Sequence, residues 1–267
     1  MPSGRLSALL LSVLACAAWF LSAGCGSGVG RVPKIEAPAL PASPAPFTDP
    51  LGIAFVPVPG GKAVIGTDKE ADPASPPHEV AVRPFYLAAT ELTVAQWREY
   101  FRLNKSHRWG MWNEVRRYSP TLDCPLVCLS WEDCDVFCRF MSRATGLTYR
   151  LPTEEEWEYA ARLGESAPSF DRAAFFRLKA EYPYAHPVKA LRPDTLGLYG
   201  MVDNAWEWTA SDFLPYPRSR SSHPLFGYEA KVLRGGGFRF PCPVWKRNPA
   251  GERIRNFSYG LRPVVEP

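Results

Sequence analysis

The sequence predicts a mixed α+β domain of short helices, short strands and much ordered loop. Three segments carry the start signal of a capped helix, a Ser or Thr followed three residues later by Asp, Glu or Gln. Two other segments alternate apolar and polar residues as half-buried strands do. The chain also contains 9 Trp, 28 Pro and 20 Gly, a composition that suits loops held in place by aromatic packing.

The strongest helix signal lies in residues 149–162, which read YRLPTEEEWEYAAR. Pro152 disfavours helical backbone at the residue before it, so no helix enters from upstream. Thr153 is a good N-cap with Glu156 as its capping-box partner, and three consecutive Glu residues place negative charge where the helix dipole favours it. Gly164 follows as the expected C-cap. The apolar face is formed by Trp157, Ala160 and Ala161.

Two further helices have the same start signal. One is expected over residues 93–103, with Thr93 as N-cap and Gln96 closing the capping box. The other begins after Ser130, with Asp133 at its third position. The inner face of this second helix is predicted to hold Cys134, Phe137, Cys138 and Met141.

Strands are expected at two places. Residues 55–66 (FVPVPGGKAVIG) alternate like a β-hairpin with Gly60 and Gly61 at the turn. Residues 206–208 (WEW) place two Trp side chains on one face of a strand and a Glu on the other.

The first residues of the chain have the pattern of a targeting segment. Arg5 is the only charged residue before Arg31, residues 6–23 are almost wholly apolar, and LSAGC ends at Cys25. This pattern is similar to a bacterial lipoprotein cleavage site. We therefore expect residues 1–24 to be a lipoprotein signal peptide and Cys25 to carry lipid, palmitate included. An uncleaved membrane anchor is the alternative, because the apolar run is almost long enough to span a bilayer.

Residues 25–50 are rich first in Gly and then in Pro and Ala, which is typical of a semi-extended linker. The folded domain is expected over residues 51–267. Because residue 26 is Gly rather than Asp, the resemblance to lipoprotein sorting signals implies the outer membrane, with the domain in the periplasm or at the cell surface. The membrane, reached through the lipid, is therefore one expected partner.

Charge excludes one class of partner. The net charge is +4, and Lys and Arg are scattered along the chain rather than clustered. We therefore expect no binding to nucleic acid.

Five cysteines lie in the expected domain, and the four His residues share no metal-ligand spacing. In an oxidising compartment these five thiols allow at most two disulfides, whose pairing the spacing does not fix. Zinc is disfavoured because zinc sites usually have two residues between paired cysteines. The preferred interpretation is buried, small, apolar side chains. The five are Cys124, Cys128, Cys134, Cys138 and Cys242.

Five motifs occur in the order found in the formylglycine-generating enzyme (sulfatase-modifying factor) domain, which the chain resembles over residues 55–265. The resemblance implies a C-type-lectin-like α+β fold. It also implies that the polar, aromatic residues 104–123 help to wall a substrate groove, with an ordinary surface loop as the alternative. The motifs are PPHEVAVRPFYLAATELTVAQW (76–97), PLVCLSWEDCDVFCRF (125–140), YRLPTEEEWEYAAR (149–162), GLYGMVDNAWEW (197–208) and LRGGGF (233–238), followed by GLR (260–262).

Copper-dependent members of that family use two cysteines shortly after their Arg-Gly-Gly motif. At the matching positions this chain has Phe240 and Trp245. Copper(I) is soft and prefers sulfur ligands, so the resemblance implies that copper is not a cofactor here and that no catalytic residue is retained. Cys242 lies between the two positions and is the one candidate for a redox thiol. A disulfide to Cys124 or Cys128, or simple burial, is the alternative for Cys242.

The resemblance also implies a structural calcium ion, held by Asp203, Asn204 and Glu207. Calcium takes carboxylate and carbonyl oxygens, which this stretch supplies. The alternative is that Asn204 only holds a turn. Asp203 stands where the family has Gly, a substitution that matters if that backbone needs a positive φ.

These observations predict a cell-envelope lipoprotein with a catalytically degenerate domain that binds or scaffolds an envelope protein. The alternative is an oxidoreductase with altered chemistry on a periplasmic peptide or thiol. A glycan-binding module is a weaker alternative, which rests on fold analogy alone.

Overall fold

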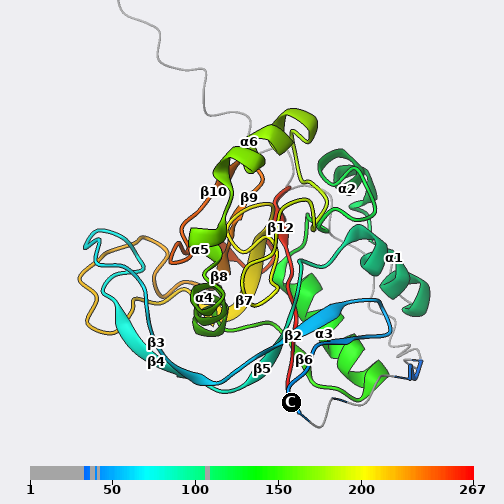
Figure 1. Cartoon of the computed structure of the whole chain (residues 1–267), viewed down its shortest axis with the longest axis horizontal. Helices are drawn as coiled ribbons and strands as arrows, with labels where there is room; N and C mark the ends of the chain where they lie inside the picture. Colours follow the sequence, from blue (N-terminus) through cyan, green and yellow to red (C-terminus); the bar gives the residue numbers. More distant parts are fainter. Residues whose placement is uncertain (1–32, 37–39, 41–42, 106–108) are drawn as a thin grey trace, which may run out of the picture. The chain divides into compact units, whose positions relative to one another are not determined.

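The computed structural model describes residues 33–36, 40, 43–105 and 109–267. The predicted signal peptide, Cys25 with its predicted lipid, and part of the predicted linker lie outside the described residues. Among the described residues, no helix has the length and apolar character needed to cross a membrane. The described part of the domain is a mixed α+β structure, which confirms the predicted class (Figure 1).

The central sheet brings the two ends of the domain together. Its five strands follow the order β1 (Phe47–Thr48), β2 (Ala54–Val58), β5 (Phe85–Ala88), β13 (Val264–Val265) and β6 (Tyr149–Arg150). All four pairings are antiparallel. Residues 47–48, which the sequence placed in the linker, belong to this sheet, and the Phe47 ring stacks on Phe55 at 5.0 Å between centroids.

The predicted hairpin over residues 55–66 is wrong. Instead, β2 pairs with β5, whereas β3 (Gly61–Ile65) pairs with β4 (His78–Val82). The register continues unchanged across the gap, so β2 and β3 are one strand of a long ribbon (Figure 1). The gap holds Pro59 and Pro84, which have no N–H to give to a ladder. The turn of this ribbon lies in residues 66–77 rather than at Gly60.

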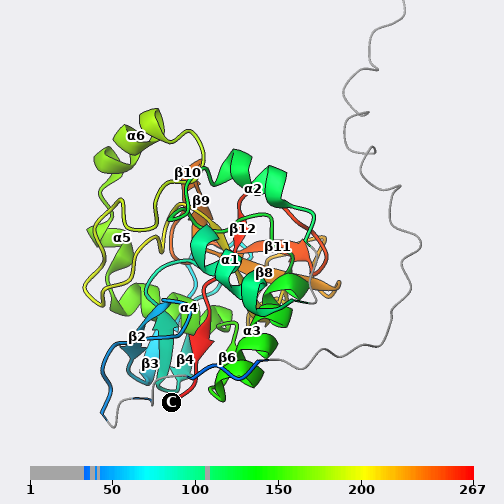
Figure 2. The same cartoon turned by 90° about the vertical axis from the view of Figure 1, so that its right-hand side faces the viewer.

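A second sheet carries the predicted Trp-Glu-Trp strand. Its order is β11 (Asn248–Gly251), β8 (Ala230–Arg234), β7 (Trp206–Asp212) and β12 (Tyr259–Gly260), and β12 runs parallel to β7. The short strands β9 (Gly236–Gly237) and β10 (Phe240–Pro241) form a separate hairpin after β8. In both views this hairpin lies at the same end of the domain as α2 and α6 (Figures 1 and 2).

The three predicted helices are confirmed with their capping boxes. They are α1 (Val94–Leu103), α3 (Trp131–Thr145) and α4 (Glu154–Leu163), capped by Thr93, Ser130 and Thr153. Three other helices were not predicted: α2 (Trp112–Tyr118), α5 (Ser166–Ser169) and α6 (Arg172–Glu181). α2 has no side-chain cap and α6 buries only Phe175, so neither carries a strong local signal.

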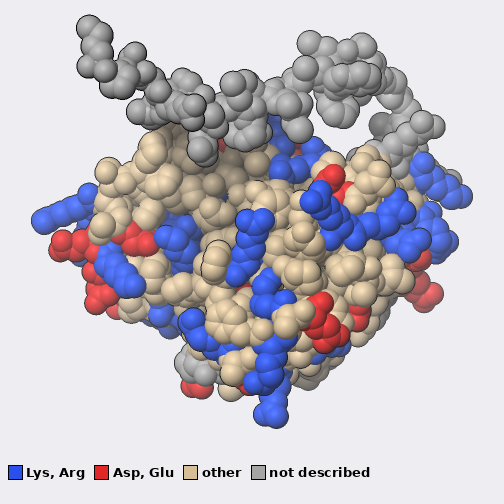
Figure 3. Space-filling view, turned by 90° about the horizontal axis from the view of Figure 1, so that it is seen from above, with Lys and Arg blue, Asp and Glu red and all other residues tan. Residues whose placement is uncertain are grey.

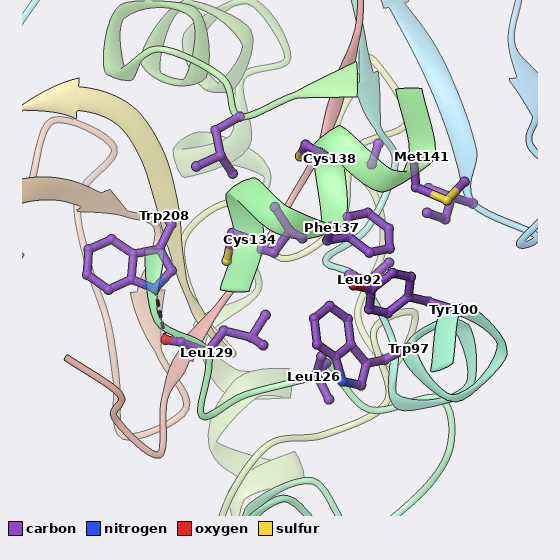
Figure 4. Close-up of a cluster of buried hydrophobic side chains, with 14 of the residues drawn as sticks. Leu92, Trp97, Tyr100, Leu126, Leu129, Cys134, Phe137, Cys138, Met141 and Trp208 are labelled. Atoms are coloured by element: carbon purple, nitrogen blue, oxygen red, sulfur yellow. Dashed lines mark hydrogen bonds between the residues drawn. The ribbon is translucent and has the colours of Figure 1, made fainter. Parts of the chain in front are cut away.

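The largest hydrophobic cluster lies where α1 and α3 pack together (Figure 4). The Phe137 ring lies 5.7 Å from the Trp97 ring and 5.1 Å from the Tyr100 ring, between centroids. Cys134 and Cys138 are buried in the same cluster, as the amphipathic pattern of α3 predicts. All five described cysteines have free thiols. The interpretation of the α3 cysteines as small core residues therefore fits the structure.

Candidate functional site

The Arg-Gly-Gly motif continues into a tight hairpin formed by β9 and β10. Phe238 and Arg239 make its turn, with Phe238 fully buried and Arg239 exposed. Gly236 has a φ of +88°, and a Cβ added there would lie 3.0 Å from the Cys242 Cβ atom. This position therefore requires glycine, because any side chain would strain the backbone and push the hairpin away from Cys242.

A groove of about 260 Å³ runs beside this hairpin. Its lining residues come from β7, β11 and β12 as well as from the hairpin, and two of the sequence motifs, residues 197–208 and 233–238, meet there. The groove is mainly aromatic and amide in character. It is lined by Trp206, Gly237, Arg239, Phe240, Cys242, Asn248, Asn256, Phe257, Ser258 and Tyr259.

The two positions that the resemblance matches to copper cysteines have separate environments. Phe240 is on the rim of the groove, where 73% of the residue is exposed. Trp245 packs instead against the cluster of Ile65, Ala74 and Tyr216, and the Lys69 ammonium lies 4.8 Å above its ring. Neither side chain has an atom that binds copper(I), so the residues present do not fit a two-thiolate copper site.

Cys242 is the only cysteine among the groove-lining residues. Its N–H donates to the Val202 carbonyl at 2.8 Å, and its Sγ is 3.9 Å from the Phe240 carbonyl oxygen. Burial raises the pKa of the Cys242 thiol, and the ammonium of Lys246 offsets only part of this effect. At neutral pH the group is therefore a thiol rather than the more nucleophilic thiolate.

Buried ion pairs hold the motifs in register behind the groove. The Arg262 guanidinium donates to both oxygens of Glu207, at 2.7–3.0 Å, and the Trp157 indole N–H donates to the same carboxylate at 2.6 Å. All three residues are fully buried. The closing GLR motif, the WEW strand and the α4 helix therefore meet at one carboxylate.

A second buried network fixes the start of the hairpin. Arg234 pairs with Glu158 and donates to the Val244 and Trp245 carbonyls at 2.7 and 3.2 Å. Glu154 accepts two hydrogen bonds from Arg247, at 2.7 and 2.8 Å. The sequence assigned Glu154 only to the helix dipole, because nothing local shows that two Arg side chains distant in sequence reach α4.

The predicted calcium ligands are each bound to protein groups. Asp203 Oδ2 accepts a hydrogen bond from His186 Nε2 at 3.1 Å, and the Asn204 side-chain oxygen accepts the His186 backbone N–H at 3.1 Å. Glu207 is held by Arg262. In the part of the chain that the structure describes, no three His, Cys, Asp or Glu side chains are grouped as a metal site. Calcium bound there would compete with Arg262 for Glu207, and it stays a prediction of the resemblance.

The backbone at this turn shows whether Asp203, which stands where the family has Gly, needs a positive φ. The residue with a positive φ is Asn204, at +68°, and not Asp203. Asn tolerates this conformation better than most residues. The alternative role of Asn204, holding a turn, is therefore the one its geometry fits.

A family model described as "Sulfatase-modifying factor enzyme 1-like domain" matches residues 43–267. The chain belongs to this family. It is 27% identical to the mouse protein named inactive C-alpha-formylglycine-generating enzyme 2, over 69% of this chain and 74% of that one. It is 26% identical to the formylglycine-generating enzyme of Streptomyces coelicolor, over 75% and 84% of the two chains.

Other similarities are consistent with membership of the sulfatase-modifying factor family. The hercynine oxygenase of Mycolicibacterium smegmatis is 27% identical, over 77% of this chain and 58% of that one. Among solved structures, PvdO from Pseudomonas aeruginosa superposes with a TM-score of 0.69 at 22% identity, and the match covers 85% of this chain and 100% of that one. The last similarity shows a shared fold.

In this sulfatase-modifying factor domain, one wall of the groove end was predicted only in part. Tyr118 ends α2, Tyr184 follows α6, and their rings pack with Phe238 and Phe257. The sequence showed residues 104–123 as polar and aromatic, which is the one signal that pointed to this wall. Tyr184 had no such signal, because it lies in a segment without periodic features.

Proposed function

We propose that this protein is a cell-envelope lipoprotein whose sulfatase-modifying factor domain binds a protein partner in the groove and has lost copper-dependent oxidation. The observation that carries the proposal is the pair of side chains at the positions matched to the copper cysteines. Phe240 is an exposed apolar anchor and Trp245 is part of the packing. An exposed aromatic ring beside an aromatic groove is a typical anchor for protein recognition.

The state of Cys242 supports binding rather than oxidation. Its pKa is raised by burial, and the other four described cysteines are buried and are not among the groove-lining residues. Burial also raises the pKa of the Cys128 thiol to about 12. A two-electron oxidation through a dithiol needs two thiols side by side, and the groove lining offers one.

Site-specific photocrosslinking in cells tests the binding proposal. Phe240 and Tyr228 are exposed aromatic residues, 73% and 69% exposed, so each is replaced in turn by p-benzoylphenylalanine. The proposal predicts a discrete crosslinked product in the envelope fraction from position 240. It predicts none from position 228, the matched control. Equal products from both positions, or none from position 240, would contradict it.

The lipoprotein part of the proposal has its own test. Labelled palmitate should be incorporated into the wild-type protein, because Cys25 ends the LSAGC segment. The Cys25→Ser variant should lose both the label and its place in the membrane fraction. A variant that keeps its place in the membrane without label would instead favour the uncleaved anchor.

The oxidoreductase alternative is favoured by one observation, the similarity to relatives named as formylglycine-generating enzyme and hercynine oxygenase. Under this alternative the groove would hold a peptide or thiol for altered chemistry at Cys242. The deletion strain should then lose a modification that wild type restores and Cys242→Ser does not. Restoration by Cys242→Ser would leave binding as the function.

A further inference from the structure

One end of the groove is built on a cluster of four aromatic rings. Tyr118 lies 5.0 Å from Tyr184 and 5.2 Å from Phe257, between ring centroids. Phe238 lies 5.8 Å from both Tyr184 and Phe257. Phe257 also lines the groove itself, so the cluster and the groove share a wall.

Three cations from three separate segments lie over these rings. The Arg239 guanidinium is 4.7 Å from the centroid of Phe257, and the Lys179 ammonium is 5.3 Å from that of Phe238. Arg117 lies 5.4 Å from the centroid of Tyr118. Contact with a ring face holds a cation in position without neutralising its charge. We name these three residues the cationic rim.

The cationic rim has no acidic partner among the described residues. None of the ion pairs within 4.0 Å includes any of the three, whereas Arg150, Arg234, Arg247 and Arg262 are all paired with carboxylates. The Lys179 ammonium donates only to the Pro183 carbonyl, at 2.8 Å. Burial, together with the nearby charge of Arg239, lowers the pKa of Lys179. Lys179 and Arg239 therefore repel each other at the groove end, and a bound anion would relieve this repulsion.

Figure 3 looks onto this end of the molecule and shows Lys and Arg side chains spread across it. The two-residue strand β10 is a poor edge for adding a further strand. In the described structure it pairs only with β9, and its second residue, Pro241, has no N–H to give to another strand. Recognition by this end of the domain therefore rests on the side chains of the groove and of the cationic rim. A peptide fits this combination of an aromatic, amide-lined groove and three cations better than a nucleic acid, which would need a longer basic surface.

We propose that Arg117, Lys179 and Arg239 select an acidic peptide segment as the partner of the groove. The proposal rests on the proposed function for the place of binding and adds the chemistry of the ligand. Carboxylates of the peptide would pair with the cationic rim. The adjoining residues would lie in the aromatic groove. Arg239, which lines the groove and stands over Phe257, links the two parts.

Fluorescence anisotropy with two defined peptides tests this proposal. The probes are fluorescein-labelled Gly-Glu-Tyr-Glu-Gly-Glu-Tyr-Glu and the same peptide with Lys in place of Glu. The test variant changes Arg117, Lys179 and Arg239 to Gln. The control variant changes Lys62, Arg98 and Arg143 to Gln, which are exposed residues on other elements. Both variants have the same net charge.

The acidic peptide should bind the wild type and the control variant, and should bind the test variant about tenfold more weakly, because three charge pairs are lost. Binding should also weaken as salt is raised. The Lys peptide should not bind. Equal weakening in both variants would show a net-charge effect and overturn the proposal, as would equal binding of the Lys peptide. Tighter binding of a 12-nucleotide single-stranded DNA, lost in the test variant, would overturn it in favour of nucleic acid.

The outcomes separate this proposal from the proposed function. A crosslink at position 240 together with no binding of the acidic peptide would reject the acidic partner and keep the binding groove. No crosslink at position 240 would reject the groove as the binding site. Thermal unfolding of both variants checks that the changes leave the fold intact.

Discussion

Asp49 is a buried carboxyl group beside the central sheet, 5% exposed. It accepts hydrogen bonds from the Leu51 and Ile53 N–H groups at 2.8 Å and from the Tyr149 hydroxyl at 2.9 Å. Burial nevertheless raises its pKa to about 6 from 3.8, because these hydrogen bonds offset only part of the cost of removing the charge from water. Asp49 should therefore make stability depend on pH in the acidic range.

The sign follows from the raised pKa. Between about pH 4 and pH 6 the unfolded chain loses this proton while the folded chain keeps it, so the free energy of unfolding falls as pH rises. The fall is about 3 kcal/mol for a pKa difference of this size. Asp49→Asn keeps an oxygen for the two N–H groups but cannot titrate. Urea unfolding at pH 4 and pH 7 should show a smaller loss in the variant, and equal losses would contradict the assignment.

Single residues were predicted best where the sequence itself carries the chemistry. The sequence alone shows that Phe240 and Trp245 cannot be copper ligands. The structure adds that Phe240 is exposed at the groove and that Trp245 packs against a hydrophobic cluster. The buried partners were not visible: Glu207 was expected to bind calcium, and in the structure its carboxylate is held by Arg262 and Trp157. A carboxylate's partner 55 residues away is set by the tertiary fold, which local patterns do not contain.

At the scale of elements, the capped helices give a direct test of the local signals. Thr153→Ala removes the hydroxyl that accepts the Glu156 N–H at 3.2 Å, which should cost about 1 kcal/mol of stability. Thr48→Ala is the matched control, since Thr48 is exposed, and it should change stability by less than about 0.5 kcal/mol. Urea unfolding measures both. Equal effects would show that the cap is not the source of the loss.

Helices and strands were predicted correctly where the hydrogen bonds that define them join residues close in sequence. They were missed where the pairing partners are distant in sequence. The capping boxes of α1, α3 and α4 are complete within four residues, so the sequence contains them. The alternation in residues 55–66 was real, but its partner strand is β4–β5 and not its own second half. Gly60 suggested a turn. In the structure Gly60 lets the two strands of the ribbon approach each other closely, because a Cβ there would lie 2.8 Å from Pro84 Cδ.

At the scale of the whole molecule, the order of motifs was enough to predict the family and the α+β class. The arrangement of the groove was not predictable, because its wall combines α2, the segment after α6 and the β9–β10 hairpin. These three pieces are joined by ring contacts between residues up to 120 positions apart, as in the Tyr118–Phe238 pair. Such contacts leave no period in the sequence, so the cationic rim is seen only in the folded domain.

We propose that this sulfatase-modifying factor domain binds a partner without copper-dependent oxidation. The most direct test is oxygen uptake by the purified protein loaded with copper(I) and given a cysteine-containing peptide, with Cys242→Ser as the control. We expect no copper-dependent uptake, and the same background rate in both proteins, because Phe240 and Trp245 supply no thiolate. Stoichiometric copper with oxygen uptake that disappears in Cys242→Ser would contradict it and restore an oxidase.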